Sequence, residues 1–94
     1  MAAVIYLRRR LNPESQWMDV IAEICSITGT TIILEGASLF SLDSIRSALE
    51  RRGATARICA VDGGYRAIAD KQADIVAYQD IASLIEMADS VISF

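Results

Sequence analysis

The sequence predicts an α/β fold with three layers, α/β/α, built around a mainly parallel sheet of about five strands. Short apolar runs rich in β-branched residues alternate with segments of helical periodicity. Strands that alternate with helices are joined by right-handed crossovers, which give a parallel sheet with both faces covered. We expect residues 1–94 to form a single domain, because a chain of this length is too short for two cores.

The five predicted strands are mostly apolar throughout rather than alternating. A continuous apolar run is typical of a strand buried on both of its faces. The predicted strands are residues 4–7, 30–34, 56–61, 74–78 and 90–94.

The first predicted helix begins at Asn12 and Pro13 and ends at Gly29. Asn is a good capping residue, Pro suits the first helical position, and Gly commonly follows a helix. We expect its core-facing side to consist of Trp17, Val20, Ile21, Ile24, Cys25 and Thr28. Cys25 is therefore interpreted as a packing residue.

Three further helical segments follow. Ser41 is a plausible cap for a helix through Arg52, residues 65–71 form one or two helical turns, and Asp80 caps a helix through Ala88. The expected core-facing residues of the two longer helices are Leu42, Ile45 and Leu49, and Ile81, Leu84 and Ile85. The pair Leu39 and Phe40, before the first of them, is either an inward-folded plug or an exposed contact for a partner.

Composition and charge exclude several classes of function. The net charge of −3 and the pI near 4.7 disfavour direct nucleic-acid binding, and no apolar run reaches the length that spans a membrane. The short basic run 8–10 is either a solvated loop or a contact for an anion or acidic partner. With 53% apolar residues, we also expect the chain to form oligomers.

The absence of histidine excludes Ser-His and Cys-His nucleophile pairs. Two widely spaced cysteines are too few for a structural zinc site, and no motif indicates a cofactor. We expect a cytoplasmic protein in which both cysteines are reduced.

Cys59 is the leading candidate for chemistry. Ligands of parallel sheets bind beyond the carboxyl ends of the strands, which directs attention to the loops 8–12, 35–41 and 59–66. Cys59 lies late in the third predicted strand, ahead of the Gly63-Gly64 turn. A following helix N-terminus and the Arg66 guanidinium would favour the thiolate, the form that attacks a sulfane sulfur. The alternative is a buried strand cysteine that acts as a small hydrophobe.

Two glycine-containing loops are weaker candidates for a binding site. Glu35 and Gly36 could present a carboxylate and backbone amides to the same pocket, although a simple strand-ending turn also explains them. Gly63 and Gly64 follow Asp62 but lack the spacing of a phosphate-binding loop.

The chain resembles the DsrE/DsrF/DsrH-like family of sulfur-transfer proteins. The resemblance begins with an apolar strand followed by an acidic-Gly turn and with a helix that stops at Arg-Gly. It continues with a strand that ends near a cysteine, an arginine in the next element, and a final helix, acidic residue and strand that ends in an aromatic residue. The matching residues are Leu34-Glu35-Gly36-Ala37, Arg52-Gly53, Cys59, Arg66, Asp89 and Phe94. The resemblance implies a parallel-sheet carrier that assembles into homo-trimers or hexamers. It also implies that Cys59 holds a persulfide and relays it from sulfur-donor to sulfur-acceptor proteins.

The chain departs from the family pattern in two ways. It is shorter than usual members, and Ala67 stands after Arg66 where the family has glycine. Two hypotheses therefore remain. The first is a sulfur carrier or sulfurtransferase, which requires an accessible, acidic Cys59. The second is a non-catalytic, oligomeric interaction subunit of the same fold, which predicts a buried and inert Cys59. A phosphocysteine carrier is disfavoured, because its cysteine would follow the first strand, where this chain has arginines.

Overall fold

A computed structural model describes residues 2–61 and 73–94 of the chain. Its sheet contains β1 (Ala2–Leu7), β2 (Gly29–Leu34), β3 (Arg57–Val61), β4 (Asp74–Val76) and β5 (Ser90–Ser93). The strand order is β4-β3-β2-β1-β5, and all four pairings are parallel. The predicted parallel five-stranded sheet is therefore confirmed. The turn predicted at 62–64 and the helical turns predicted at 65–71 lie outside the described residues.

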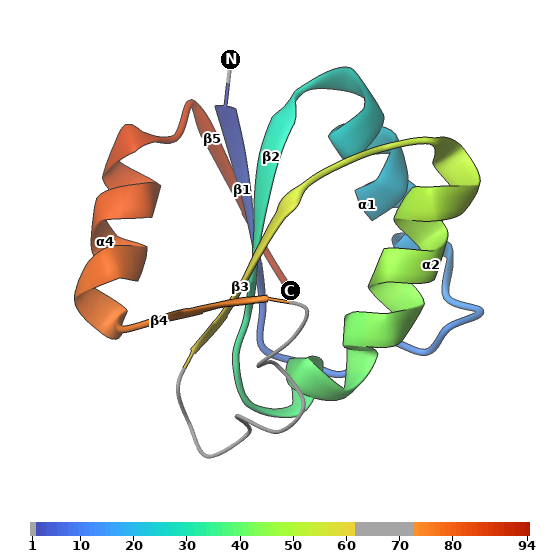
Figure 1. The fold of residues 1–94 in the computed structure, drawn as a ribbon, viewed down its shortest axis with the longest axis horizontal. Coiled ribbons are helices and arrows are strands. Elements are labelled where there is room, and N and C mark those ends of the chain that lie inside the picture. Colours follow the sequence, from blue (N-terminus) through green and yellow to red (C-terminus); the bar gives the residue numbers. More distant parts are fainter. Residues whose placement is uncertain (1, 62–72) are drawn as a thin grey trace.

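Helices cover both faces of this sheet. The helical elements are α1 (Gln16–Ile27), the 3₁₀ helix η1 (Gly36–Ser41), α2 (Leu42–Arg52) and α4 (Tyr78–Met87). Helices α1 and α2 lie on one face and α4 lies on the other, as Figure 1 shows. The three-layer α/β/α architecture is therefore confirmed.

The central strands bury side chains on both faces, because successive strand residues point to opposite sides. On the face of α1 and α2, the strands contribute Ile5, Leu7, Ile32, Leu34, Ile58 and Ala60 to the larger core cluster. On the face of α4, a smaller cluster consists of Val4, Ile33, Cys59, Val61, Val76 and Ile81. This alternation explains why the predicted strands read as continuous apolar runs.

Helix α1 starts later than predicted. Its N-cap is Ser15, whose Oγ accepts a hydrogen bond from the Trp17 N–H at 3.2 Å. Asn12 instead makes a turn, because its side-chain oxygen accepts from the Glu14 N–H at 3.0 Å and its carbonyl accepts from the Ser15 N–H. The prediction that Asn12 and Pro13 begin the helix is therefore wrong.

The predicted buried side of α1 is also partly wrong. Ile21 and Cys25 are buried as expected, together with Met18 and Ala22. The side chains of Trp17 and Val20 are exposed, since the helix is rotated so that the next residues along the sequence face the sheet.

The segments around α2 and α4 give a mixed outcome. The core positions predicted for α2, Leu42, Ile45 and Leu49, are all buried. Leu39 is buried, as the inward-folded alternative expects, whereas Phe40 is exposed. In α4 Ile81 is buried, whereas Ile85 is exposed and the prediction for it is wrong.

Two buried serines connect η1 to the chain after β1. The Ser38 hydroxyl donates to the Leu7 carbonyl at 2.6 Å and accepts from the Glu35 N–H at 2.8 Å. The Ser41 hydroxyl accepts from the Leu11 N–H at 2.8 Å. Because the groups bonded by Ser38 lie where β1 and β2 end, this serine stabilises the carboxyl edge of the sheet, and Ser41 holds the loop that follows β1.

None of the helices in the described ranges combines the length and the apolar character that crossing a membrane requires.

We predict that Ser38→Ala lowers the free energy of unfolding by about 1–3 kcal/mol, the usual cost of leaving buried polar groups without a partner. Ser38 is fully buried, and two backbone groups would lose its hydroxyl. Ser47→Ala, at an exposed position of α2, is the matched control and should change stability little. Urea unfolding measures both, and equal midpoints for the two variants would contradict the role given to Ser38.

Candidate functional site

The Cys59 side chain points from β3 toward α4 and is enclosed by apolar neighbours. It belongs to the smaller core cluster and is 0% exposed. Its register partners are Ile33 on β2 and Asp74 on β4. Cys59 therefore occupies the position of a core residue in the middle of a sheet face.

Burial raises the pKa of the Cys59 thiol above its ordinary value. The Arg57 guanidinium lowers this pKa by a smaller amount, and the carboxylates of Asp74 and Asp80 raise it further. The uncharged thiol is therefore favoured. This is the state that the interaction-subunit hypothesis expects and the reverse of the accessible, acidic thiol that a persulfide carrier needs.

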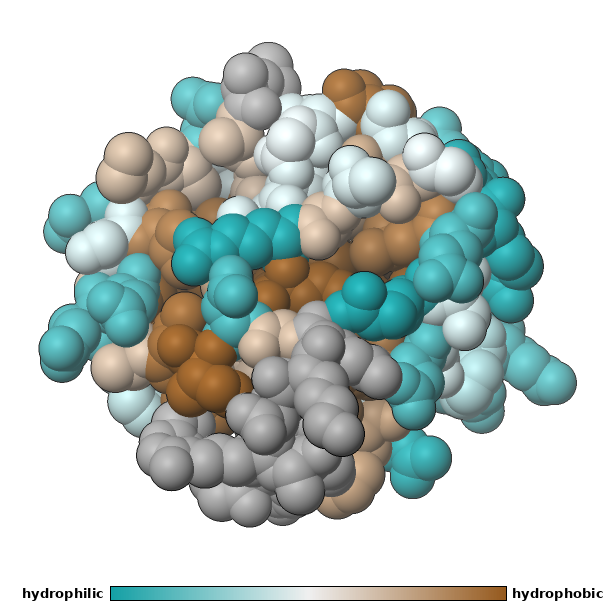
Figure 2. Space-filling view, viewed as in Figure 1, coloured by the Kyte–Doolittle hydropathy of each residue, from teal (hydrophilic) through white to brown (hydrophobic). Residues whose placement is uncertain are grey.

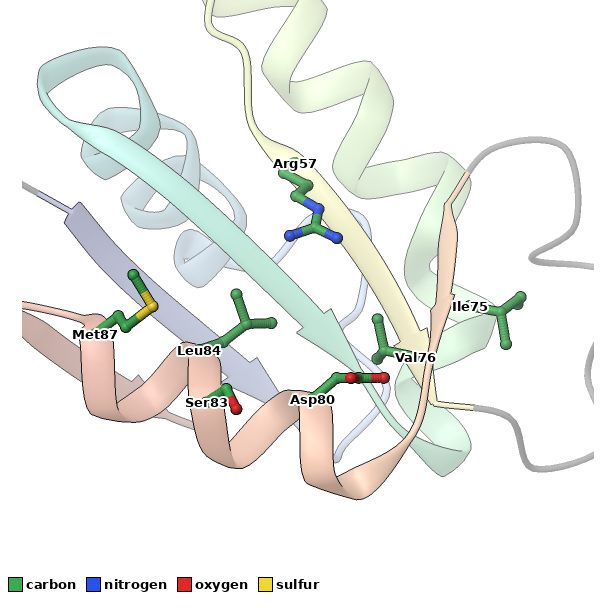
Figure 3. A pocket seen from close by; sticks show the side chains of 7 residues that line it. All are labelled: Arg57, Ile75, Val76, Asp80, Ser83, Leu84 and Met87. Atoms are coloured by element: carbon green, nitrogen blue, oxygen red, sulfur yellow. The ribbon is translucent and has the colours of Figure 1, made fainter.

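A groove lies between α4 and the β3–β4 edge of the sheet, on the same face as Cys59 (Figure 3). Its volume is about 370 Å³, within the range of small-molecule sites. Figure 2 shows apolar surface between hydrophilic side chains in the middle of the molecule. The groove is lined by Arg57, Ile75, Val76, Asp80, Ser83, Leu84 and Met87.

Arg57 is the cationic residue that lines this groove and also acts on the Cys59 thiol. The two residues are two positions apart in β3, so their side chains leave the same face of the sheet. The Nε of Arg57 donates to the Oδ2 of Asp74 at 2.9 Å. In Figure 3 the guanidinium extends over the groove. Cys59 itself does not line the groove, because its neighbours in the core cover the sulfur.

A second polar group lies at the carboxyl edge of the sheet, around Glu35. The Tyr6 hydroxyl donates to one oxygen of the Glu35 carboxylate at 2.9 Å, and the Tyr78 hydroxyl donates to the other. The Arg8 guanidinium lies over the Tyr6 ring, 5.7 Å from its centroid. Because Tyr78 begins α4 and Glu35 follows β2, this carboxylate ties the start of α4 to the sheet.

The predicted site residues are only partly brought together. Glu35 reaches the Cys59 region through Tyr6, which packs against the smaller core cluster and also bonds the Glu35 carboxylate. Gly36 adopts a φ of 60°, where a side chain would be strained, and thus allows η1 to begin directly after Glu35. Arg66, Gly63 and Gly64 lie outside the described residues.

Sequence reasoning missed Arg57, Tyr6 and Tyr78. The alternation of a strand was a usable signal for Arg57, since residues two apart share a face. No local pattern predicts that Tyr6 and Tyr78, from opposite ends of the chain, converge on one carboxylate. That convergence depends on the strand order.

Within the part of the chain that the structure describes, no three His, Cys, Asp or Glu side chains lie close enough together to hold a metal ion.

We predict that Tyr6 titrates with a pKa of about 12, above its ordinary value of 10.0, because burial and the Glu35 carboxylate both disfavour the tyrosinate. The raised pKa stabilises the fold fully below pH 10.0, and this contribution is lost as the pH rises toward 12. Tyr6→Phe should show a smaller alkaline decrease in stability, and part of the decrease should remain because the Tyr78 hydroxyl bonds the same carboxylate and its pKa is also raised. Tyrosinate absorbance and urea unfolding measure the two effects, and a Tyr6 that ionises at its ordinary pKa would contradict the bond to Glu35.

The chain matches no family model, and no curated protein or solved structure is significantly similar to it.

Proposed function

We propose that this chain is a non-catalytic interaction subunit, a protein that binds other chains and does not itself transfer sulfur. The observation that carries this proposal is the state of Cys59, which is 0% exposed and has a raised thiol pKa. Sulfur transfer requires a thiolate that can approach the sulfane sulfur of a donor. A neutral thiol enclosed between the sheet and α4 meets neither requirement.

Exposed apolar side chains support a binding role. Of the residues of α4, Ile81 alone is fully buried. Tyr78, Ile85 and Met87 on the same helix are exposed, with Met87 at 81%. Tyr78 and Ile85, seven residues apart, lie on the same side of the helix, and contiguous exposed apolar surface commonly marks a contact with another protein. A partner that binds to α4 would therefore remove these exposed apolar side chains from water.

The resemblance to the DsrE/DsrF/DsrH-like family agrees with this proposal. That family assembles into trimers or hexamers, and it includes members without a working cysteine. The confirmed three-layer parallel fold is the scaffold that the resemblance implies. A subunit that only assembles with other chains needs this scaffold and its surface, and it does not need a reactive thiol.

The persulfide carrier is the second candidate function, and Arg57 favours it. Its guanidinium lowers the pKa of the Cys59 thiol and also lines the neighbouring groove. In this candidate α4 moves away from the sheet, and Cys59 attacks the outer sulfur of a donor persulfide. Cys59 then holds that sulfur as a persulfide, and the donor leaves as a thiolate. Arg66 is the second residue assigned to this activity by the resemblance.

We predict that native, reduced protein treated with a sulfane-sulfur donor gains no sulfur at Cys59, because the thiol is buried. Intact-protein mass spectrometry of wild type, Cys59→Ser and Cys25→Ser measures this. The Cys25→Ser variant is the matched control, since Cys25 is also buried with a raised pKa. The same proteins unfolded in urea should react at each remaining cysteine.

Sulfur uptake by the native protein would instead support the persulfide carrier. A gain of about one sulfur atom that reduction removes, present in native wild type and absent from Cys59→Ser alone, would contradict the proposal.

A further inference from the structure

The two edges of the sheet are protected to different degrees. The strand order places β4 and β5 at the edges. Strand β4 has three residues, and its Asp74 is paired with Arg57. Short length and charge are two devices that keep an edge strand from pairing with another chain. Strand β5, with four residues, is also short, but its sequence Ser-Val-Ile-Ser contains no charge and no proline. Its outer side therefore lacks the charge that protects β4.

Apolar side chains flank β5 on both faces of the sheet. Val91 is 44% exposed and lies on the face of α4, since it is the register partner of Val4. On the other face, the ring of Trp17 meets that of Phe94 edge-on, with 5.2 Å between the centroids. This contact places one flank of α1 beside the edge strand. The β5 edge surface consists of Val91, Phe94 and Trp17, and the exposed Val20 and Ile27 lie on the same side of α1 as Trp17.

The two ends of this edge carry opposite charges. Asp89 precedes β5, and its N–H donates to the Ala2 carbonyl at 2.8 Å, so it lies where β1 starts. Arg8 lies at the other end, because its N–H donates to the Phe94 carbonyl at 3.0 Å. Arg9 and Arg10 follow it. The edge is thus neutral in its middle, acidic where β5 begins and basic where β5 ends.

We infer that the β5 edge surface joins two copies of this chain, whose β5 strands pair antiparallel about a two-fold axis. The inference rests on the proposed function, since it names the surface and the partner of an interaction subunit. A two-fold axis perpendicular to the sheet reverses the strand direction and keeps both α4 helices on the same side. The two sheets then form one continuous sheet, and the same surface of each copy contacts its equivalent.

Charge selects a second copy in this orientation. In an antiparallel pair, Asp89 of one copy lies about two strand spacings, ~10 Å, from the arginine run of the other. Charges at this separation still attract at moderate ionic strength. A parallel pairing would instead bring like charges together at both ends. In the antiparallel pair, the acidic end of each β5 edge lies near the basic end of the other. The Trp17 and Phe94 rings of both copies then lie on the same face of the continuous sheet.

Sedimentation equilibrium of the full chain tests this inference with Val91→Lys and the matched control Ile75→Lys. The two residues are exposed to a similar extent, 44% and 41%, and lie on the two opposite edge strands. Wild type should form an even-numbered assembly. Val91→Lys should raise the dissociation constant at least about tenfold, and Ile75→Lys should leave it unchanged.

A second variant tests the charged ends without disturbing the fold. Asp89→Asn keeps an acceptor for the Ala2 N–H, which Asp89 bonds at 2.7 Å, and removes the negative charge. It should weaken the assembly and reduce its sensitivity to salt, with an unchanged thermal unfolding midpoint at a dilution where both proteins are monomeric.

Three results would overturn the inference: a monomeric or trimeric wild type, equal effects of Val91→Lys and Ile75→Lys, or an assembly insensitive to Asp89→Asn and to salt. The proposed function is judged separately by the sulfur-uptake measurement. A monomeric wild type whose Cys59 takes up no sulfur overturns the surface alone. An even-numbered assembly whose Cys59 takes up sulfur overturns the proposed function alone.

Discussion

Strands β1, β2 and β3 must bury side chains on both faces of the sheet, and the rest of the structure follows from this requirement. Each strand sends one set of apolar residues to α1 and α2 and the alternate set to α4. Cys59 belongs to the second set and shares a buried cluster with Val61 and Ile33. Its thiol therefore packs as a small apolar group. A reactive thiol at this position would need charge and solvent where the fold requires an apolar contact.

The helices cover the two faces of the sheet unequally, and this leaves apolar surface in solvent on the less covered side. Helices α1 and α2 together bury a large cluster, whereas α4 contributes Ile81 as its single fully buried residue on the opposite face. The Glu35 carboxylate, held by Tyr6 and Tyr78, secures the start of α4 with polar bonds instead. The apolar side chains left in solvent along α4 and beside β5 are surface that a binding partner can cover.

The parts of the fold that depend on local patterns could be predicted from the sequence. Continuous apolar runs mark strands, and Gly53, with its φ of 63°, ends α2 as a glycine stop predicts. The start of α1 could not be predicted in this way, because Asn12 can form either a cap or a turn and only the surrounding structure decides. The exposed positions of Trp17 and Ile85 depend on a helix rotation that periodicity alone does not fix.

The candidate site was less predictable than the fold. Cys59 was identified from its place in a strand, but its orientation depends on register, since a shift of one residue moves a side chain to the other face. The groove beside it requires Arg57 from β3 and Asp80 from α4, which come together only through the tertiary fold. Glu35 was predicted as a candidate from its position after β2, whereas its two tyrosine partners come from distant segments.

The pH dependence of Cys59 alkylation in a Cys25→Ala variant tests whether Cys59 is a buried, neutral thiol. Native protein should react far more slowly than unfolded protein, with an apparent thiol pKa above the value of the unfolded chain, because burial disfavours the thiolate. Rapid alkylation of the native protein, with an apparent pKa below that of the unfolded chain, would contradict this expectation and identify Cys59 as a reactive site.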